Sequence, residues 1–252
     1  MFSENVVKIS KYLGKMDRLK EIEILLGEHE QFYIYKTSLS KELIDCTEIK
    51  KLFGYNAIRF IQLLLYRSKS LIEGSIHALN NNSSLSSIIS VRAHFETTGS
   101  IAYLLKRLSS YYRGNIDFEK LDEDLFRLSL GSTTINNPEV PKPIQVLNLI
   151  DATDEFLKKN LLKDKAPHDK IFREFYEDLC DFCHPNFQGI QSGSDIIHEE
   201  KAIIFHKTNR ISNSDFTLFS YLNISAELFI YFYKEVLKLL MEKEIMPIFH
   251  NN

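Results

Sequence analysis

The spacing of apolar residues predicts that most of the chain is helical. Apolar side chains recur every three or four residues over residues 4–27, from about 40 to 80 and over 85–112, which is the period of a helix that buries one face. A shorter helix is predicted between Asp117, a residue type favoured at helix starts, and Gly131, a residue type favoured just past helix ends. The first half of the chain therefore reads as a succession of helices.

The second half continues this pattern with one interruption. Residues 143–160 predict two short helices or one broken helix. Residues 168–183 show a strongly amphipathic helical pattern that Pro185 ends, because proline cannot continue the helical hydrogen bonding. Residues 214–243 are apolar on almost every side, so this helix is expected either in the centre of a bundle or in a dimer interface.

Two segments lack helical periodicity. Residues 132–143 contain three prolines and are expected to form a loop or a lid. Residues 185–212 are irregular, but turn residues precede the β-branched and aromatic run 203–205, which suits a small hairpin near 190–207. We therefore predict one helical domain over residues 1–252: an all-α, multi-helix bundle with long antiparallel helices and at most this one hairpin.

Composition and charge narrow the functional classes. Hydrophobic residues make up 44% of the chain and charged residues 26%, as in ordinary folded proteins, and low numbers of glycine (9) and proline (6) favour helices over many-stranded folds.

The longest apolar runs, 60–66 and 228–233, are far shorter than the ~18 residues that a membrane span needs, and charged residues interrupt the N-terminus where a secretory signal would be apolar. We expect a cytoplasmic protein with no membrane partner and with reduced cysteines. Residues 1–112 carry 15 Lys and Arg against 11 Asp and Glu, which permits a basic patch but does not demand a nucleic-acid partner.

The segment CDFCHPN, residues 180–186, contains C-x-x-C-H, the pattern of covalent haem attachment. That chemistry needs an exported chain, and both cysteines fall within a predicted helix. Zinc is a second interpretation, with Cys180, Cys183, His198 and His206 as ligands, although the seven-residue gap between the histidines exceeds the usual three to five. The interpretation that we favour makes both cysteines small packing residues of a buried helix, with no metal and no cofactor.

Arg92 and Glu96 are polar exceptions within an apolar pattern. They fall on or beside the buried stripe of the helix predicted over 85–112, one helical turn apart. A buried charge is costly unless it is paired and hydrogen-bonded, and an i,i+4 pair of Arg and Glu supplies part of that compensation. The pair is either a structural ion pair at the rim of the core or part of a catalytic site, in which Glu96 holds Arg92 in place as the cation.

His184 ends the helix predicted over 168–183 and is the candidate catalytic acid or base. A helical net places Arg173, Tyr176 or Glu177, and Cys180 on the same face as His184, and Asn186 follows immediately. Tyr176, Asn186 and Arg173 are therefore candidate substrate-binding residues. The alternative is that His184 only caps the last carbonyl groups of its own helix.

Two segments together resemble a group of uncharacterised bacterial helical proteins. SIISVRAHFETTGSIAYL contains R-x3-E, and FYEDLCDFCHPNFQG, some eighty residues later, contains Y-x2-L-[SC]-x3-H-[PA]; the matching positions are Arg92, Glu96, Tyr176, Leu179, Cys180, His184 and Pro185. That group looks like a relative of the HEPN superfamily, all-helical dimers that include metal-independent ribonucleases of toxin and phage-defence systems. The chain departs from the R-x4-6-H motif of those nucleases, because Arg173 lies eleven residues before His184.

The resemblance implies one function, and the residues leave another open. A composite site would use His184 to move a proton and Arg92, held by Glu96, to neutralise a phosphate during attack of an RNA 2′-hydroxyl. The expected partners are then RNA and a second copy of the chain in a homodimer. The alternative is a non-catalytic dimeric binding or sensor module with a polar pocket between helices.

Overall fold

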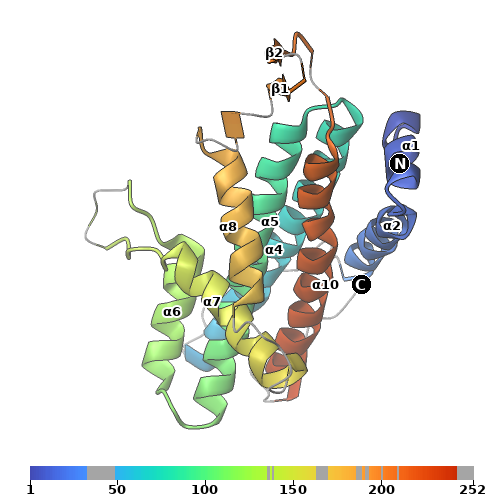
Figure 1. Ribbon diagram of the computed structural model, residues 1–252. Coiled ribbons are helices and arrows are strands. Elements are labelled where there is room, and N and C mark those ends of the chain that lie inside the picture. Colours follow the sequence, from blue (N-terminus) through green and yellow to red (C-terminus); the bar gives the residue numbers. More distant parts are fainter. Residues whose placement is uncertain are drawn as a thin grey trace.

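Helices make up most of the part of the chain that the structure describes. The computed structural model describes residues 1–32, 49–134, 137, 139–162, 170–185, 189–190, 193–199, 201–208 and 210–242. In chain order these form α1 (Glu4–Tyr12), α2 (Met16–Gln31), α4 (Ile49–Asn80), α5 (Ser84–Tyr112), α6 (Phe118–Leu130), α7 (Val146–Leu157), a π-helical turn η1 (Lys158–Leu162), α8 (Ile171–Cys183), β1 (Ser194–Ile197), β2 (Ala202–Phe205) and α10 (Asn213–Glu242), shown in Figure 1. The prediction of an all-α, multi-helix bundle with one small hairpin is confirmed.

Helix α5 lies at the centre of the bundle. It packs against α4, α7, α8 and α10, and Figure 1 shows α4, α8 and α10 running alongside it. Its buried face carries Ile88, Val91 and Phe95, and the Phe95 ring stacks on Phe172 of α8 with ring centres 4.3 Å apart. Gly99 lets α7 approach closely, because a side chain there would lie 2.9 Å from backbone atoms of Leu149.

Helix α10 also lies in the bundle core. It packs against α2, α4, α5 and α8. Its buried side chains point in several directions and include Phe216, Phe219, Leu222, Phe229, Phe232 and Val236. The apolar character predicted for residues 214–243 on almost every side is thus explained by burial within the chain itself.

One long helix was expected over residues 4–27, and this was wrong. Gly14 has a φ of +66°, a left-handed conformation that favours glycine. The N–H of Lys15 donates to the carbonyl of Ser10 at 2.9 Å and the N–H of Gly14 donates to that of Lys11 at 3.2 Å, which is the pair of bonds that ends a helix in a Schellman motif. The apolar period continues across this break, so α1 and α2 both bury one face. The predicted start of the second helix, near residue 40, lies outside the described residues.

The two non-helical segments have simple structures where they are described. Strands β1 and β2 form an antiparallel hairpin in which Asp195 pairs with Ile204 and Ile196 pairs with Ile203. The described residues of 132–143 form neither helix nor strand. The base of this loop is closed by a bond from the N–H of Ser132 to the carbonyl of Pro141, 3.0 Å long.

A chain of hydrogen bonds crosses the core between α2, α4, α5 and α10. His29 Nδ1 lies 2.7 Å from the carbonyl oxygen of Leu25, so Nδ1 carries the proton, and His29 Nε2 accepts from the Ser68 hydroxyl at 2.7 Å. Ser68 accepts in turn from His94 Nε2 at 2.7 Å, and His94 Nδ1 accepts from Ser225 at 2.8 Å. Each of these groups is satisfied when both histidines are neutral. Burial lowers the pKa of His94 to about 3 and also lowers that of His29.

Candidate functional site

Arg92, Glu96 and Tyr176 meet where α5 packs against α8. Arg92 Nε lies 3.5 Å from Glu96 Oε1, and the Tyr176 hydroxyl donates to the same oxygen at 2.9 Å. The guanidinium carbon of Arg92 lies 5.7 Å from the centre of the Tyr176 ring. The side chains of Arg92 and Glu96 are 30% and 28% exposed, so the pair lies at the rim of the core with one side toward solvent.

The surroundings of Arg92 fix the protonation of its neighbours. Burial raises the pKa of Tyr176 above its ordinary value, and Glu96 adds to this effect, so the phenol stays a hydrogen-bond donor. Burial also raises the pKa of the Cys183 thiol, although Arg92 opposes that shift. Burial alone would lower the pKa of Arg92, but its contacts with Tyr176, Cys180 and Glu96 raise it. The cluster is thus a permanent cation beside a carboxylate, a phenol and a neutral thiol.

His184 follows this cluster at the end of α8. Its backbone N–H donates to the carbonyl of Cys180 at 3.0 Å, and its side chain is exposed. Cys183, the residue before it, is in electrostatic contact with Arg92, but in the described part of the chain no hydrogen bond joins the His184 ring to Arg92. Asn186, predicted as a substrate-binding residue, lies outside the described residues.

Arg173 lies apart from the cluster and fastens α8 to α7. Its Nη1 pairs with Asp151 at 3.0 Å and its Nε with Glu177 at 2.9 Å. The carboxylate of Asp154 accepts from the backbone N–H groups of Phe172 at 2.8 Å and Arg173 at 3.0 Å, so α7 caps the start of α8. Burial raises the pKa of Asp154 to about 6. The position of Arg173 gives it an anchoring role in the fold.

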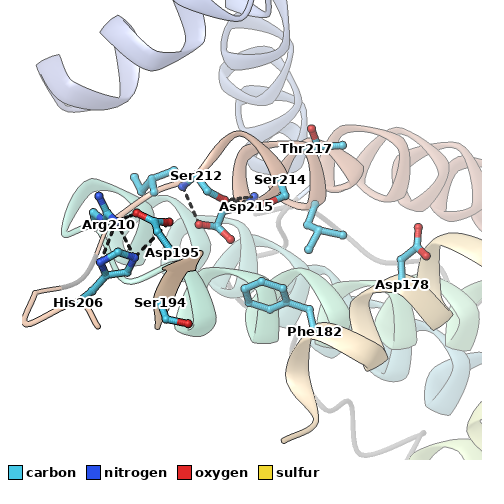
Figure 2. A pocket seen from close by; sticks show the side chains of 12 residues that line it. Asp178, Phe182, Ser194, Asp195, His206, Arg210, Ser212, Ser214, Asp215 and Thr217 are labelled. Carbon is cyan, nitrogen blue, oxygen red and sulfur yellow. Dashed lines mark hydrogen bonds and ion pairs between the residues drawn. The ribbon is translucent and has the colours of Figure 1, made fainter. Parts of the chain in front are cut away.

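A cavity of about 790 Å³ opens between α8, the hairpin and the start of α10. Figure 2 shows residues from the hairpin at one end, Asp178 at the other and Phe182 between them. Its described lining comprises Asp178, Phe182, Ser194, Asp195, His206, Arg210, Ile211, Ser212, Ser214, Asp215, Thr217 and Leu218. This volume suits a small-molecule ligand. None of these residues was predicted as a site residue from the sequence, apart from His206 in the zinc interpretation.

Asp195, His206 and Arg210 meet at the hairpin end of the cavity. His206 Nε2 lies 3.4 Å from Asp195 Oδ1, and Arg210 Nη2 forms an ion pair with the Asp195 carboxylate. The same Nη2 lies 2.7 and 2.6 Å from the two ring nitrogens of His206. Arg210 therefore neutralises Asp195, and little net charge remains at this end.

Asp215 lies in the middle of the cavity wall and belongs to a closed helix start. The N–H of Ser212 donates to Asp215 Oδ2 at 2.7 Å, and the N–H of Asp215 donates to Ser212 Oγ at 3.1 Å, which is a reciprocal capping arrangement. The Ser84 hydroxyl of α5 donates to the same carboxylate at 3.1 Å. This buried carboxylate thus accepts hydrogen bonds from an uncharged backbone N–H and an uncharged hydroxyl.

Asp178 forms the other end of the cavity and is open to solvent. Its Oδ2 accepts from the Tyr221 hydroxyl of α10 at 3.1 Å. Phe175 stacks on Tyr221 with ring centres 4.4 Å apart, so the phenol is fixed from both α8 and α10. Burial raises the pKa of Tyr221 to about 12, and its bond to Asp178 contributes to the shift. Among the described residues no Lys, Arg or His forms an ion pair with Asp178.

The cysteines of the C-x-x-C-H segment pack against the apolar core. Cys180 and Cys183 are half-buried and pack against this core, which is the packing role that the favoured interpretation predicted. His198 lies in the hairpin turn and His206 lines the cavity, so the candidate zinc ligands are on separate parts of the fold. Within the described ranges, no three His, Cys, Asp or Glu side chains are gathered as a metal site requires.

Comparisons with protein-family models, curated proteins and solved structures found no match to this chain. The resemblance to the HEPN superfamily, and the ribonuclease activity and homodimer that it implies, therefore stay predictions. No helix in the described part of the chain has both the length and the apolar composition needed to cross a bilayer.

Proposed function

We propose that this protein is a binding module for a small organic cation, which it holds in the cavity between α8, the hairpin and α10. The observation that carries the proposal is Asp178, a carboxylate that lines the cavity without a basic partner among the described residues. A ligand ammonium or guanidinium group would form a charge-assisted hydrogen bond with it. Tyr221 leaves the remaining lone pairs of this carboxylate free for that bond.

The charge of the lining supports a positive ligand. In the described lining of the cavity, the three aspartates Asp178, Asp195 and Asp215 accompany one guanidinium, that of Arg210, which is paired with Asp195. The ammonium group of Lys15 approaches Thr217 on the wall at 3.0 Å, but within the described residues it forms no ion pair with these aspartates. A cationic ligand would reduce this excess of negative charge, whereas a polyanion such as RNA would be repelled.

The apolar part of the wall supports an organic ligand over a hydrated metal ion. Phe182 is almost fully buried and presents its ring between the two polar ends, and Ile211 and Leu218 complete this surface. Alkyl chains of amines and guanidines would pack here while the charged group reaches Asp178. The proposal is one form of the non-catalytic binding module expected from the sequence.

Thermal unfolding with a ligand panel tests this function. The panel contains agmatine, spermidine and choline as cations, with ribose and inorganic phosphate as neutral and anionic controls. A ligand that binds the folded state raises the unfolding temperature, by an amount that grows with its concentration relative to Kd. We expect a rise with at least one cation and none with ribose or phosphate. Equal responses to cations and phosphate, or no response to any cation, would contradict the proposal.

Metal-independent cleavage of RNA is a second proposed function, supported by a separate observation. Arg92 lies against Cys183 in the last turn of α8, and the exposed His184 comes directly after it. Here His184 would move the proton of the attacking 2′-hydroxyl and Arg92 would stabilise the phosphate. Glu96 partly neutralises this cation, which makes the cluster a weaker basis than the cavity.

The test of the second function is incubation of a mixed RNA panel with the wild type and with His184→Ala, each with and without EDTA. Cleavage that persists with EDTA and is lost in the variant would support it. Because the His184 side chain is exposed, the variant should keep the unfolding free energy of the wild type within about 0.5 kcal/mol. Absence of cleavage by the wild type would contradict this function without affecting the cation-binding proposal.

A further inference from the structure

The hairpin exposes an apolar face at one end of the bundle. Strand alternation places Ile196, Ile203 and Phe205 on the same face, and these side chains are 51%, 56% and 76% exposed. In Figure 1 the hairpin lies beyond the ends of α5 and α10. An isolated two-stranded hairpin is marginally stable in water, and a cluster of exposed apolar residues commonly marks an interaction surface.

Strand β2 also has an outer edge that no other strand in the described part of the chain pairs with. The N–H of His206 donates to the carbonyl of Gly193 at 2.9 Å, so His206, and by alternation Ile204, direct their backbone groups toward β1. Ile203 and Phe205 then direct theirs to the opposite edge. No charged residue or proline lies within Ala202–Phe205. Natural edge strands usually carry such residues to prevent strand addition.

We infer that this edge is a homodimer interface, in which β2 pairs antiparallel with β2 of a second copy. The two-fold axis passes between Ile203 and its copy, so that these two residues exchange both backbone hydrogen bonds. A two-fold interface of this kind is isologous, and it joins two hairpins into one four-stranded sheet. Lys201 then lies opposite Phe205 of the second copy, and Ala202 opposite Ile204.

Charge selects this register and this partner. With the axis at Ile203, the hairpin tip that carries Glu199 lies beside the base of the other hairpin, which carries Lys207, and the contact occurs twice by symmetry. An axis at Ile204 would instead place Lys201 opposite Lys207 of the second copy, and like charges facing each other across strands are destabilising. The outer edge of β2 is therefore complementary in charge to its own copy when the axis lies at Ile203, but not when the axis lies at Ile204.

The interface is small, and we expect a weak dimer. It consists of one short strand pairing and two peripheral ion pairs, which puts it below the ~1,200 Å² typical of stable complexes. The inference does not depend on cation binding in the cavity, because it uses the outer edge and outer face of the hairpin. It gives the homodimer predicted from the sequence a specific surface.

Sedimentation velocity of the full chain from about 1 µM to about 1 mM tests the inference, since weak interfaces associate in this range. Ile203→Lys places like charges opposite each other at the axis, and Lys207→Glu places a carboxylate beside Glu199. Each should weaken dimerisation at least tenfold. The double variant Glu199→Lys/Lys207→Glu exchanges the charges and should restore it. Ile24→Lys is the matched control, because Ile24 is 64% exposed on α2, away from the hairpin.

Three results would overturn the inference. A wild type that stays monomeric over the whole range excludes the second copy and leaves the edge to a strand of a different protein. A dimer that Ile203→Lys does not weaken forms through another surface. A dimer that Ile203→Lys weakens, but whose affinity does not follow the charge exchange between residues 199 and 207, excludes the proposed register.

Discussion

His94 lies between Ser68 and Ser225 in the core, with hydrogen bonds of 2.7 and 2.8 Å at its two ring nitrogens. Its Nε2 donates to Ser68 and its Nδ1 accepts from Ser225, and the series of hydrogen bonds continues from Ser68 to His29. A second proton on the ring would turn the acceptor nitrogen into a donor and reverse the bond from Ser225. The helices that carry these residues, α2, α4, α5 and α10, are thus held in register by a network that needs neutral histidines.

Acid should destabilise the protein through these histidines. In the unfolded chain His94 titrates near 6.5 and in the folded protein near 3, so the unfolded state binds more protons between these values. The stabilisation is complete above about pH 6.5 and is lost as the pH falls, by about 1 to 2 kcal/mol between pH 7 and pH 5 for one such group. Urea unfolding at several pH values measures this slope. His94→Leu should be less stable at pH 7 and should show a smaller slope; an unchanged slope would contradict the assignment.

Asp154 should contribute more than an ordinary helix cap. Asp154→Ala removes the acceptor of two backbone N–H groups at the start of α8, and we expect a loss of about 2 kcal/mol in the free energy of unfolding. The matched control is Asp117→Ala, which removes an exposed cap with one bond to the N–H of Lys120, at about 1 kcal/mol. Chemical denaturation of both variants provides the comparison. Equal losses would show that Asp154 does not fix α8 to α7.

Glu96 and Tyr176 should act as a coupled pair. Glu96→Ala leaves the half-buried Arg92 without its counter-ion and removes the acceptor of the Tyr176 hydroxyl, for an expected loss of about 2 kcal/mol, and Tyr176→Phe removes one hydrogen bond, for about 1 kcal/mol. Because both contacts use the same carboxylate oxygen, the double variant should lose less than the sum of the single losses. A double-mutant cycle measures the difference. Additivity within about 0.3 kcal/mol would mean that the contacts are independent.

The helices could be predicted from the sequence because their signals are local. Periodicity and capping residues predict a helix that begins at Asp117 and ends at Gly131, and the structure confirms both ends of α6. The break at Gly14 was missed because the apolar period continues through it. The same helical spacing predicts Arg92, Glu96 and Tyr176 as candidate site residues, and the structure places their side chains in contact. His94 carried the same kind of signal, three residues after Val91 on the buried face of α5, and was overlooked.

The cavity could not be predicted in the same way. Asp178, Asp195 and Asp215 come from α8, the hairpin and α10, and each looks like an ordinary polar residue in its own segment. Their grouping depends on how the chain returns after α8, which no local pattern encodes. That no basic residue of the described part of the chain pairs with Asp178 is likewise a property of the folded arrangement.

Isothermal titration calorimetry with agmatine tests the cation-binding function most directly. The titration compares the wild type with Asp178→Asn, which removes the charge but keeps an oxygen that accepts from Tyr221, and with Asp17→Asn, an exposed aspartate on α2. We predict that agmatine binds the wild type and Asp17→Asn equally and Asp178→Asn at least tenfold more weakly, a difference of about 1.4 kcal/mol. Equal affinity for all three proteins, or no binding to the wild type, would contradict the proposed role of Asp178.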